Sequence, residues 1–402
     1  MNIFWKLKTR RINIRDSKYN TILLILTVFL FSLCLAYLCK GFYTLVFDSS
    51  SLGGRDLLER WKEQQYIYSR IYPYRVSPKM IDPQLGKIRS GGYPPWSFFT
   101  GFLVFPPISW TATRFYHAFL NILSLSILIR FAYLIGKPFG KISAYFFVAA
   151  CLAISSHCTT LNNGQYGIII NAFLICVYWC INNYRNNWAG LFLGLALAKP
   201  NISIFYPFIL IIKKRFKSFF ITVFYICFST FYIVWLTRLD LKDVIVRFVK
   251  HIQHVSDDGF SIINVFIDSG LNIELTLLLL SGIAAIVGVL IFHWLQDVSL
   301  LNLFAIACVI GRVSIYHRSY DDVMLVFLLL ALLQLAFSHT HWLNIFVSMF
   351  VGLTLWLPLS LQNLGNPYWS FLQIVVWLVA IVYLLLNSSA INNGITKSLV
   401  NN

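Results

Sequence analysis

The chain has 402 residues, of which 58% are hydrophobic and only 12% charged, and its mean hydropathy is +0.71. Soluble domains carry about a quarter charged residues, so this composition excludes a soluble enzyme and indicates a polytopic membrane protein. The net charge of +17 does not indicate nucleic-acid binding, because no basic tract with interleaved aromatic residues lies in a soluble segment and basic loops are ordinary in membrane proteins.

The N-terminal residues 1–19 are basic and precede an apolar segment, 20–47, that is too long for the core of a signal peptide. Lys and Arg are in excess on the cytoplasmic side of membrane proteins. We therefore expect a cytoplasmic N-terminus and a first span that leads outward. The stretch 48–112 then forms a large outer loop.

Within this loop the segment from Pro95 to Trp110 is apolar but unsuited to a continuous helix. It begins with Tyr93-Pro94-Pro95 and is interrupted by Pro106-Pro107, and proline inside a helix removes a hydrogen bond. If the segment crossed the membrane, the later basic loops would fall on the wrong side. We expect it to be juxtamembrane or re-entrant.

The short basic connections 137–141, 182–187 and 213–217 place the following spans, since such loops face the cytoplasm. Between the last two, the apolar pieces 188–198 and 202–212 are each too short to cross. They predict a broken hairpin with Lys199-Pro200 at a membrane-depth apex, where irregular backbone is tolerated if it lines a cavity.

An amphipathic stripe over 239–256 predicts an interfacial helix on the outer face, and the remaining spans return the tail, 387–402, to the cytoplasm. Because spanning segments in lipid must be helical, the sequence predicts one all-α, polytopic integral membrane domain over 1–402. We expect about 11–13 transmembrane or re-entrant helices, given the length that crossing requires.

The sequence contains no pattern that favours a metal site. The eight cysteines lie in or beside apolar runs without a Cys-x-x-Cys pair, so we expect them to pack as small apolar side chains. Cys176 and Cys180 share a helical face, and His251 and His254 are three residues apart, but neither pair has a third ligand nearby. We expect packed thiols, two exposed histidines and no cofactor.

With this topology the unusual polar residues of the chain gather on the outer side. The acid of the outer loop, a tyrosine at the Pro-Pro motif, a Gly-Gln turn, a Lys-Pro turn and a late His-Arg pair beside an acid all face the same way. They are Asp56, Tyr93, Gln165, Lys199, Tyr316, His317, Arg318 and Asp321.

The order of these motifs resembles that of the C-type polytopic glycosyltransferases, and within them glycosyltransferase family 87, the polyprenol-phosphate-mannose-dependent mannosyltransferases. The motifs that carry the resemblance are Asp56, Pro73-Tyr74, Tyr93-Pro94-Pro95, Gly164-Gln165, Lys199-Pro200, and His317 with Asp321. Three positions depart from the family pattern: Arg70 stands where glycine is expected, Gly167 where asparagine is common and Asn201 where glutamine is usual.

The resemblance implies a C-type glycosyltransferase fold and the transfer of a hexose, with mannose favoured, from a polyprenyl-phosphate-linked donor to a hydroxyl of a lipid or glycan acceptor. It implies inverting transfer on the outer face without a metal, with Asp56 as general base. The cations Lys199, His317 and Arg318 would stabilise the departing phosphate. Gln165, Tyr93 and Asp321 are the other expected substrate-binding residues.

Structural roles compete with each of these assignments. Asp56 could be a solvated acid at a helix start, Lys199 could snorkel to the interface, and Asp321 with Asp322 could favour a helix N-terminus. Tyr93 could give only shape, and His317 could fill an interfacial turn. The loop arginines, Arg60 among them, could contact anionic headgroups.

Two other function classes fit the same composition. A transporter or flippase of lipid-linked glycans predicts charges buried mid-span and related halves, and the sequence offers few such acids and no convincing repeat. A noncatalytic subunit of an envelope assembly complex would tolerate loss of Asp56.

Overall fold

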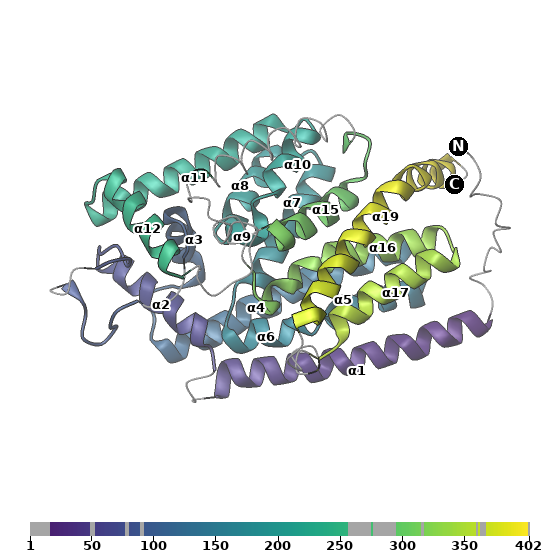
Figure 1. Ribbon diagram of the computed structural model, residues 1–402, viewed down its shortest axis with the longest axis horizontal. Helices are drawn as coiled ribbons and strands as arrows, with labels where there is room; N and C mark the ends of the chain where they lie inside the picture. The colour runs from purple at the N-terminus through teal and green to yellow at the C-terminus, as the bar shows by residue number, and fades with distance from the viewer. Residues whose placement is uncertain are drawn as a thin grey trace.

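The computed structural model describes residues 17–48, 53–76, 80–88, 92–255, 275, 295–314, 317–358, 361 and 367–400. Within these residues the chain forms helices and no strand, which confirms the all-α prediction. In Figure 1 the long helix α1 runs along one edge of the molecule and α11 along the opposite edge.

The first half of the described chain alternates long helices with short ones. Its elements are α1 (Ser17–Phe47), α2 (Arg55–Tyr68), α3 (Pro95–Val104), α4 (Trp110–Gly136), η2 (Lys137–Phe139), α5 (Lys141–Leu152), α6 (Ser156–Asn163) and α7 (Gly167–Asn182). The second half contains α8 (Asn186–Ala196), α9 (Pro200–Ser203), α10 (Tyr206–Ile212), α11 (Phe216–Thr237), α12 (Leu241–Val255), α15 (Leu300–Ser314), η4 (Ser319–Leu325), α16 (Val326–Ser338), α17 (Trp342–Trp356) and α19 (Pro367–Val400).

Four helical segments of the described chain are long and apolar enough to cross a membrane, and a fifth joins them if the bent pair α5 and α6 is one span. Shorter apolar helices of 10–17 residues accompany them, among them α3, α7 and α15. Lengths and composition therefore support an integral membrane protein.

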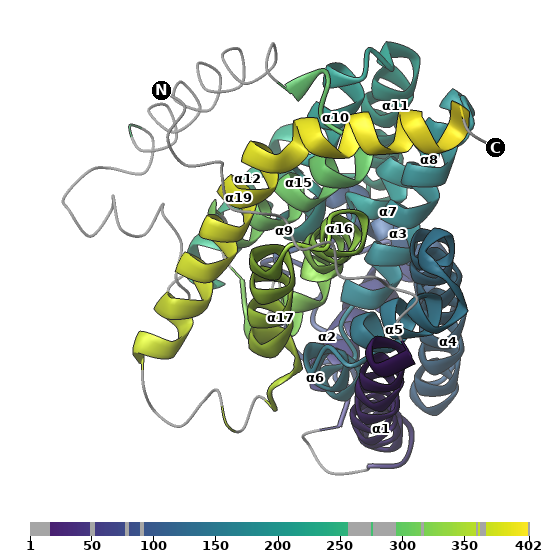
Figure 2. The same ribbon diagram turned by 90° about the vertical axis from the view of Figure 1, so that its right-hand side faces the viewer.

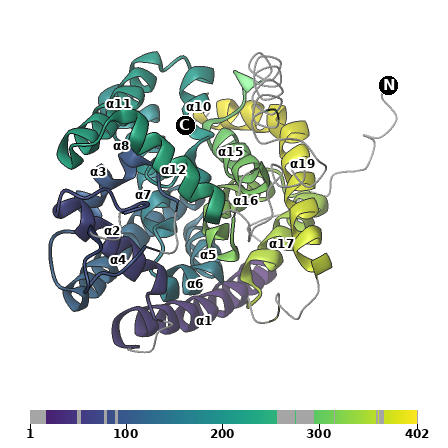
Figure 3. The same cartoon turned by 60° about the vertical axis from the view of Figure 1, so that its left-hand side comes forward.

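In the described part of the segment 48–112, which we expected to form an outer loop, the helices α2 and α3 precede α4. With 10 residues, α3 reaches about 15 Å, which is half of the hydrocarbon core of a bilayer. It is too short to cross alone. Figures 1 and 3 show α2, α3 and α12 gathered at one end of the molecule.

The hairpin around Lys199-Pro200 is broken as its sequence suggests. The chain leaves α8 at Ala196, turns at Lys199 with non-helical backbone (φ −122, ψ 80), and starts the short α9 at Pro200. Proline disfavours helical backbone at the residue before it. The turn directs the Lys199 side chain into the protein, where only 4% of the residue is exposed.

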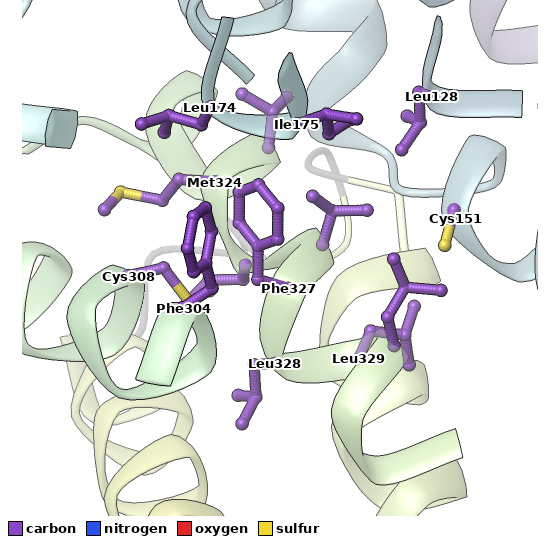
Figure 4. Close-up of a cluster of buried hydrophobic side chains, with 14 of the residues drawn as sticks. Leu128, Cys151, Leu174, Ile175, Phe304, Cys308, Met324, Phe327, Leu328 and Leu329 are labelled. Atoms are coloured by element: carbon purple, nitrogen blue, oxygen red, sulfur yellow. The ribbon is translucent and has the colours of Figure 1, made fainter. Parts of the chain in front are cut away.

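The core is centred on α16. All residues from Val323 to Leu333 are buried, and α16 contacts α4, α5, α15, α17 and α19, as the view in Figure 2 shows. Figure 4 shows the packing, with the rings of Phe304 and Phe327 5.2 Å apart. The apolar character of this helix therefore serves protein packing more than contact with lipid.

One expectation is wrong in detail. His251 on α12 is not an exposed histidine: it is 6% exposed and stacks on Tyr74 with ring centroids 4.1 Å apart. The residues from 387 onward, expected as a cytoplasmic tail, are helical and continue α19 as far as Val400. Below Ser17, the expected cytoplasmic N-terminus lies outside the described residues.

Candidate functional site

The start of α2 lies against the turn between α6 and α7, because two glycines adopt left-handed backbone there. Gly54 (φ 67) precedes α2 and its N–H donates to the Asn162 carbonyl at 2.7 Å. Gly164 (φ 66) ends α6, and a Cβ at this position would collide with the Leu57 side chain. Glycine has no side chain to clash in either place. These glycines bring Asp56 next to Gln165.

Asp56 is hydrogen-bonded to Gln165 across this contact. Gln165 Nε2 donates to Asp56 Oδ2 at 2.5 Å, and Asp56 remains partly exposed. The other carboxylate oxygen accepts no hydrogen bond from the residues that the structure describes. One oxygen is thus fixed while the second is left for another donor.

Lys199 lies on the far side of the same amide. Its Nζ donates to Gln165 Oε1 at 3.0 Å and to Asp321 Oδ1 at 2.5 Å, and it lies 5.0 Å from the centre of the Tyr320 ring. A buried ammonium requires such partners, since desolvation of an unpaired charge is costly. Lys199 therefore does not snorkel to the interface.

Asp321 lies in the first turn of η4 and is 1% exposed. Besides Lys199, its carboxylate accepts from Asn201 Nδ2 at 3.3 Å and from the Arg318 N–H at 3.3 Å. The contact with the Arg318 N–H is the one expected of an acid at the start of a helix, as the sequence suggests. Asn201, one of the departures from the family pattern, thus has a defined contact.

Side chains of α6 and α7 hold η4 in place. Ser156 Oγ donates to the Ser319 carbonyl at 2.8 Å, Thr160 Oγ1 to the Tyr320 carbonyl at 2.7 Å, and Asn171 Nδ2 to the Val323 carbonyl at 2.7 Å. The carboxylate of Asp321 is consequently fixed relative to the α6–α7 turn that carries Gln165.

Tyr93 approaches Gln165 from the segment that precedes α3. Its hydroxyl donates to Gln165 Oε1 at 3.4 Å, and its ring lies 5.5 Å from the ring of Tyr166. The Tyr93-Pro94-Pro95 motif thus brings a hydroxyl to the amide and gives more than shape. The structure therefore joins Asp56, Tyr93, Gln165, Lys199 and Asp321 in one hydrogen-bonded group.

His317 and Arg318 lie at the edge of this group. Arg318 is linked to it through its N–H and exposes its side chain, whereas His317 is 7% exposed. Tyr316 lies outside the described residues. Of the expected cations, Lys199 donates to the group from its side chain.

The sequence interpretation of Arg60 is wrong. This arginine is 5% exposed, pairs with Glu63 on the same helix, and places its guanidinium 3.9 Å from the centre of the Tyr93 ring, far from any headgroup contact. Burial raises the pKa of the Glu63 carboxyl, and the Arg60 guanidinium opposes this shift and favours the charged carboxylate. The spacing of Asp56, Arg60 and Glu63 on one face of α2 was the signal that could have shown it.

No group of three or more His, Cys, Asp or Glu side chains lies within reach of one metal ion among the described residues. A surface hollow at the opposite end of α8 from Lys199 contains none of the residues above; it is lined by Tyr184, Arg185, Asn186, Asn187, Trp188 and Lys217.

Comparison with known proteins agrees with the motif order. Residues 93–338 match the family model of glycosyltransferase family 87, and this stretch includes Tyr93, Gln165, Lys199 and Asp321. Asp56 precedes it and joins the group through its contact with Gln165. No curated protein matches the chain. Since the match covers more than half of the 402 residues, the chain belongs to glycosyltransferase family 87 and is a membrane glycosyltransferase.

Proposed function

We propose that the protein transfers a hexose, with mannose as the sugar, from a polyprenyl-phosphate-linked donor to a hydroxyl of a glycolipid or glycan acceptor. The family supports glycosyl transfer between a donor and an acceptor. The donor and the sugar rest on the motif order. The outer-face location follows from the basic loops, which belong to the cytoplasm.

Asp56 is the general base in this proposal. The observation that carries it is the bond from Gln165 Nε2 to Asp56 Oδ2, which orients the carboxylate while its second oxygen stays available for an acceptor hydroxyl. A carboxylate so placed removes the hydroxyl proton as the new bond to the anomeric carbon forms. Attack opposite the departing phosphate inverts the anomeric centre.

Positive charge stabilises the departing phosphate. Arg318, exposed at the edge of the group, and His317 are assigned to contact the phosphate directly. Lys199 Nζ is hydrogen-bonded to Gln165 and Asp321. Its positive charge therefore stabilises the phosphate without direct contact. With these cations the proposal includes no metal and no other cofactor.

The Asp56→Asn variant tests this function. Asparagine keeps an oxygen that accepts from Gln165 but cannot take a proton, so turnover falls by about 10² to 10⁴-fold while folding and donor binding remain. The assay measures transfer of radiolabelled sugar from polyprenyl-phosphate mannose by purified protein, and NMR of the product gives its anomeric configuration.

Glu59→Gln is the matched control, because Glu59 lies on the same helix as Asp56 and pairs with Lys62 at 3.5 Å. Its turnover should equal that of the wild type. Unchanged turnover in Asp56→Asn would reject the base. Translocation of a lipid-linked glycan without transfer, by the wild type, would favour a flippase instead.

A further inference from the structure

The proposed mechanism assigns no role to a buried ion pair on α2, the helix that carries the base Asp56. Arg60 and Glu63 are 5% and 1% exposed, and Arg60 lies one helical turn after Asp56 on α2. The cost of taking two charges out of water is large, and apolar replacements of such pairs are often neutral or stabilising. Stability alone is therefore a weak reason for this pair.

The pair holds Tyr93 from two sides. The Arg60 guanidinium lies 3.9 Å from the centre of the Tyr93 ring. Glu63 interacts electrostatically with Tyr74, and the Tyr74 hydroxyl accepts from the Tyr93 N–H at 2.9 Å. The ring and the backbone of Tyr93 are thus both tied to α2.

Tyr93 in turn acts on the amide of Gln165. The Tyr93 hydroxyl and Lys199 Nζ both donate to Gln165 Oε1. With both donors on the oxygen, the amide must present its Nε2 to Asp56. A reversed amide would place an oxygen against the carboxylate, where two acceptors repel.

We propose that the Arg60–Glu63 pair is a positioning device for the general base, which acts through Tyr93 and Gln165 and sets the orientation of the Asp56 carboxylate. This inference rests on the proposed function. Arg60 and Glu63 touch no substrate in it. They act on the rate of the chemical step and leave donor binding unchanged.

The test replaces both charges together with apolar residues of similar size, in Arg60→Met/Glu63→Leu, so that no unpaired charge is buried. Because a misplacement of about 1 Å can cost about 10²-fold in rate, kcat should fall by about 10 to 100-fold while KM for polyprenyl-phosphate mannose stays within about twofold. Lys62→Met is the control, since Lys62 lies on the same helix and pairs with Glu59.

A double-mutant cycle shows whether the effect passes through Tyr93. In a Tyr93→Leu background the pair replacement should lower kcat no further, because the link is already cut. Full additivity of the two losses would overturn the inference, and so would wild-type kcat in Arg60→Met/Glu63→Leu. If that variant does not fold, Arg60→Lys decides: a folded protein with wild-type kcat overturns the proposal, and a lowered kcat supports it.

Asp56→Asn measured in parallel separates the two proposals. An inactive Asp56→Asn beside a fully active pair variant rejects only the positioning role. A fully active Asp56→Asn rejects the base itself.

Discussion

Gln165 carries one acceptor group and one donor group, and its neighbours engage both. The oxygen accepts from Lys199 and Tyr93, and the nitrogen donates to Asp56. An amide can accept from a cation with its oxygen and donate to a carboxylate with its nitrogen. Asp56 and Lys199 are thereby coupled without a direct ion pair that would occupy the carboxylate.

Gly164 makes this arrangement possible, and its replacement should disturb it. In Gly164→Ala the left-handed backbone costs about 1–2 kcal/mol, and the new methyl group meets Leu57. We expect a lower unfolding temperature. We also expect a lower kcat at temperatures where the variant is still folded, because α2 must move away from Gln165.

Thermal unfolding and sugar transfer measured on the same preparation check this. Gly86→Ala is the control, since Gly86 has a similar φ of 68 but nothing within 4 Å of a Cβ there. It should share the backbone cost and keep wild-type kcat. Equal activity losses in the two variants would contradict the proposed contact.

At the scale of elements, η4 depends on hydroxyl groups of α6. In Thr160→Val the shape is kept and the donor to the Tyr320 carbonyl is lost, which leaves a buried carbonyl without this partner at a cost of about 1–3 kcal/mol. Asp321 should shift with η4, so the unfolding temperature and the transfer rate should both fall.

Thr159→Val is the comparison, because the Thr159 hydroxyl bonds only within its own helix, to the Ser156 carbonyl at 3.2 Å. Differential scanning fluorimetry and kcat/KM give the two readouts. If Thr160→Val behaves as Thr159→Val does, α6 does not hold Asp321 in place.

The ends of the helices were easier to predict from the sequence than the contacts between side chains. The proline pattern of 93–107 and the short apolar pieces around Lys199-Pro200 determine where helices stop, and the helices follow these limits. The helical spacing of Arg60 and Glu63 is visible in the sequence, but the burial of their pair is not, because a charged helix face has the same pattern whether solvent or protein covers it. Similarly, the burial of His251 depends on Tyr74, a residue far away in sequence.

At the scale of the molecule, the topology predicts which segments can be reached from outside. A single cysteine at exposed Lys87 of the outer loop should react with a membrane-impermeant maleimide on intact cells, and one at exposed Lys141 at the start of α5 should not. The background must lack the exposed native thiols Cys39 and Cys227. Labelling after permeabilisation is the control, and the reverse pattern would invert the proposed orientation.

The candidate site, too, exists only at this scale. Its side chains come from α2, the segment before α3, the α6–α7 turn, the start of α9 and η4, and no local pattern joins them. The order of the motifs indicated the candidate residues. The hydrogen bonds between these residues could be identified only from the folded structure.

Because other helices enclose α16, its residues must meet two requirements: they must be apolar enough to enter the bilayer, and they must fit the packed protein interior. Hydropathy reports only on the first. A bulkier residue in place of Leu329, which is 0% exposed, would look like an equally good segment to the machinery that inserts helices into the bilayer. In the finished protein it would have no room, since interiors are packed as densely as organic crystals. Variants in this helix are therefore expected to enter the membrane normally and to fail afterwards, when the neighbouring helices close around it.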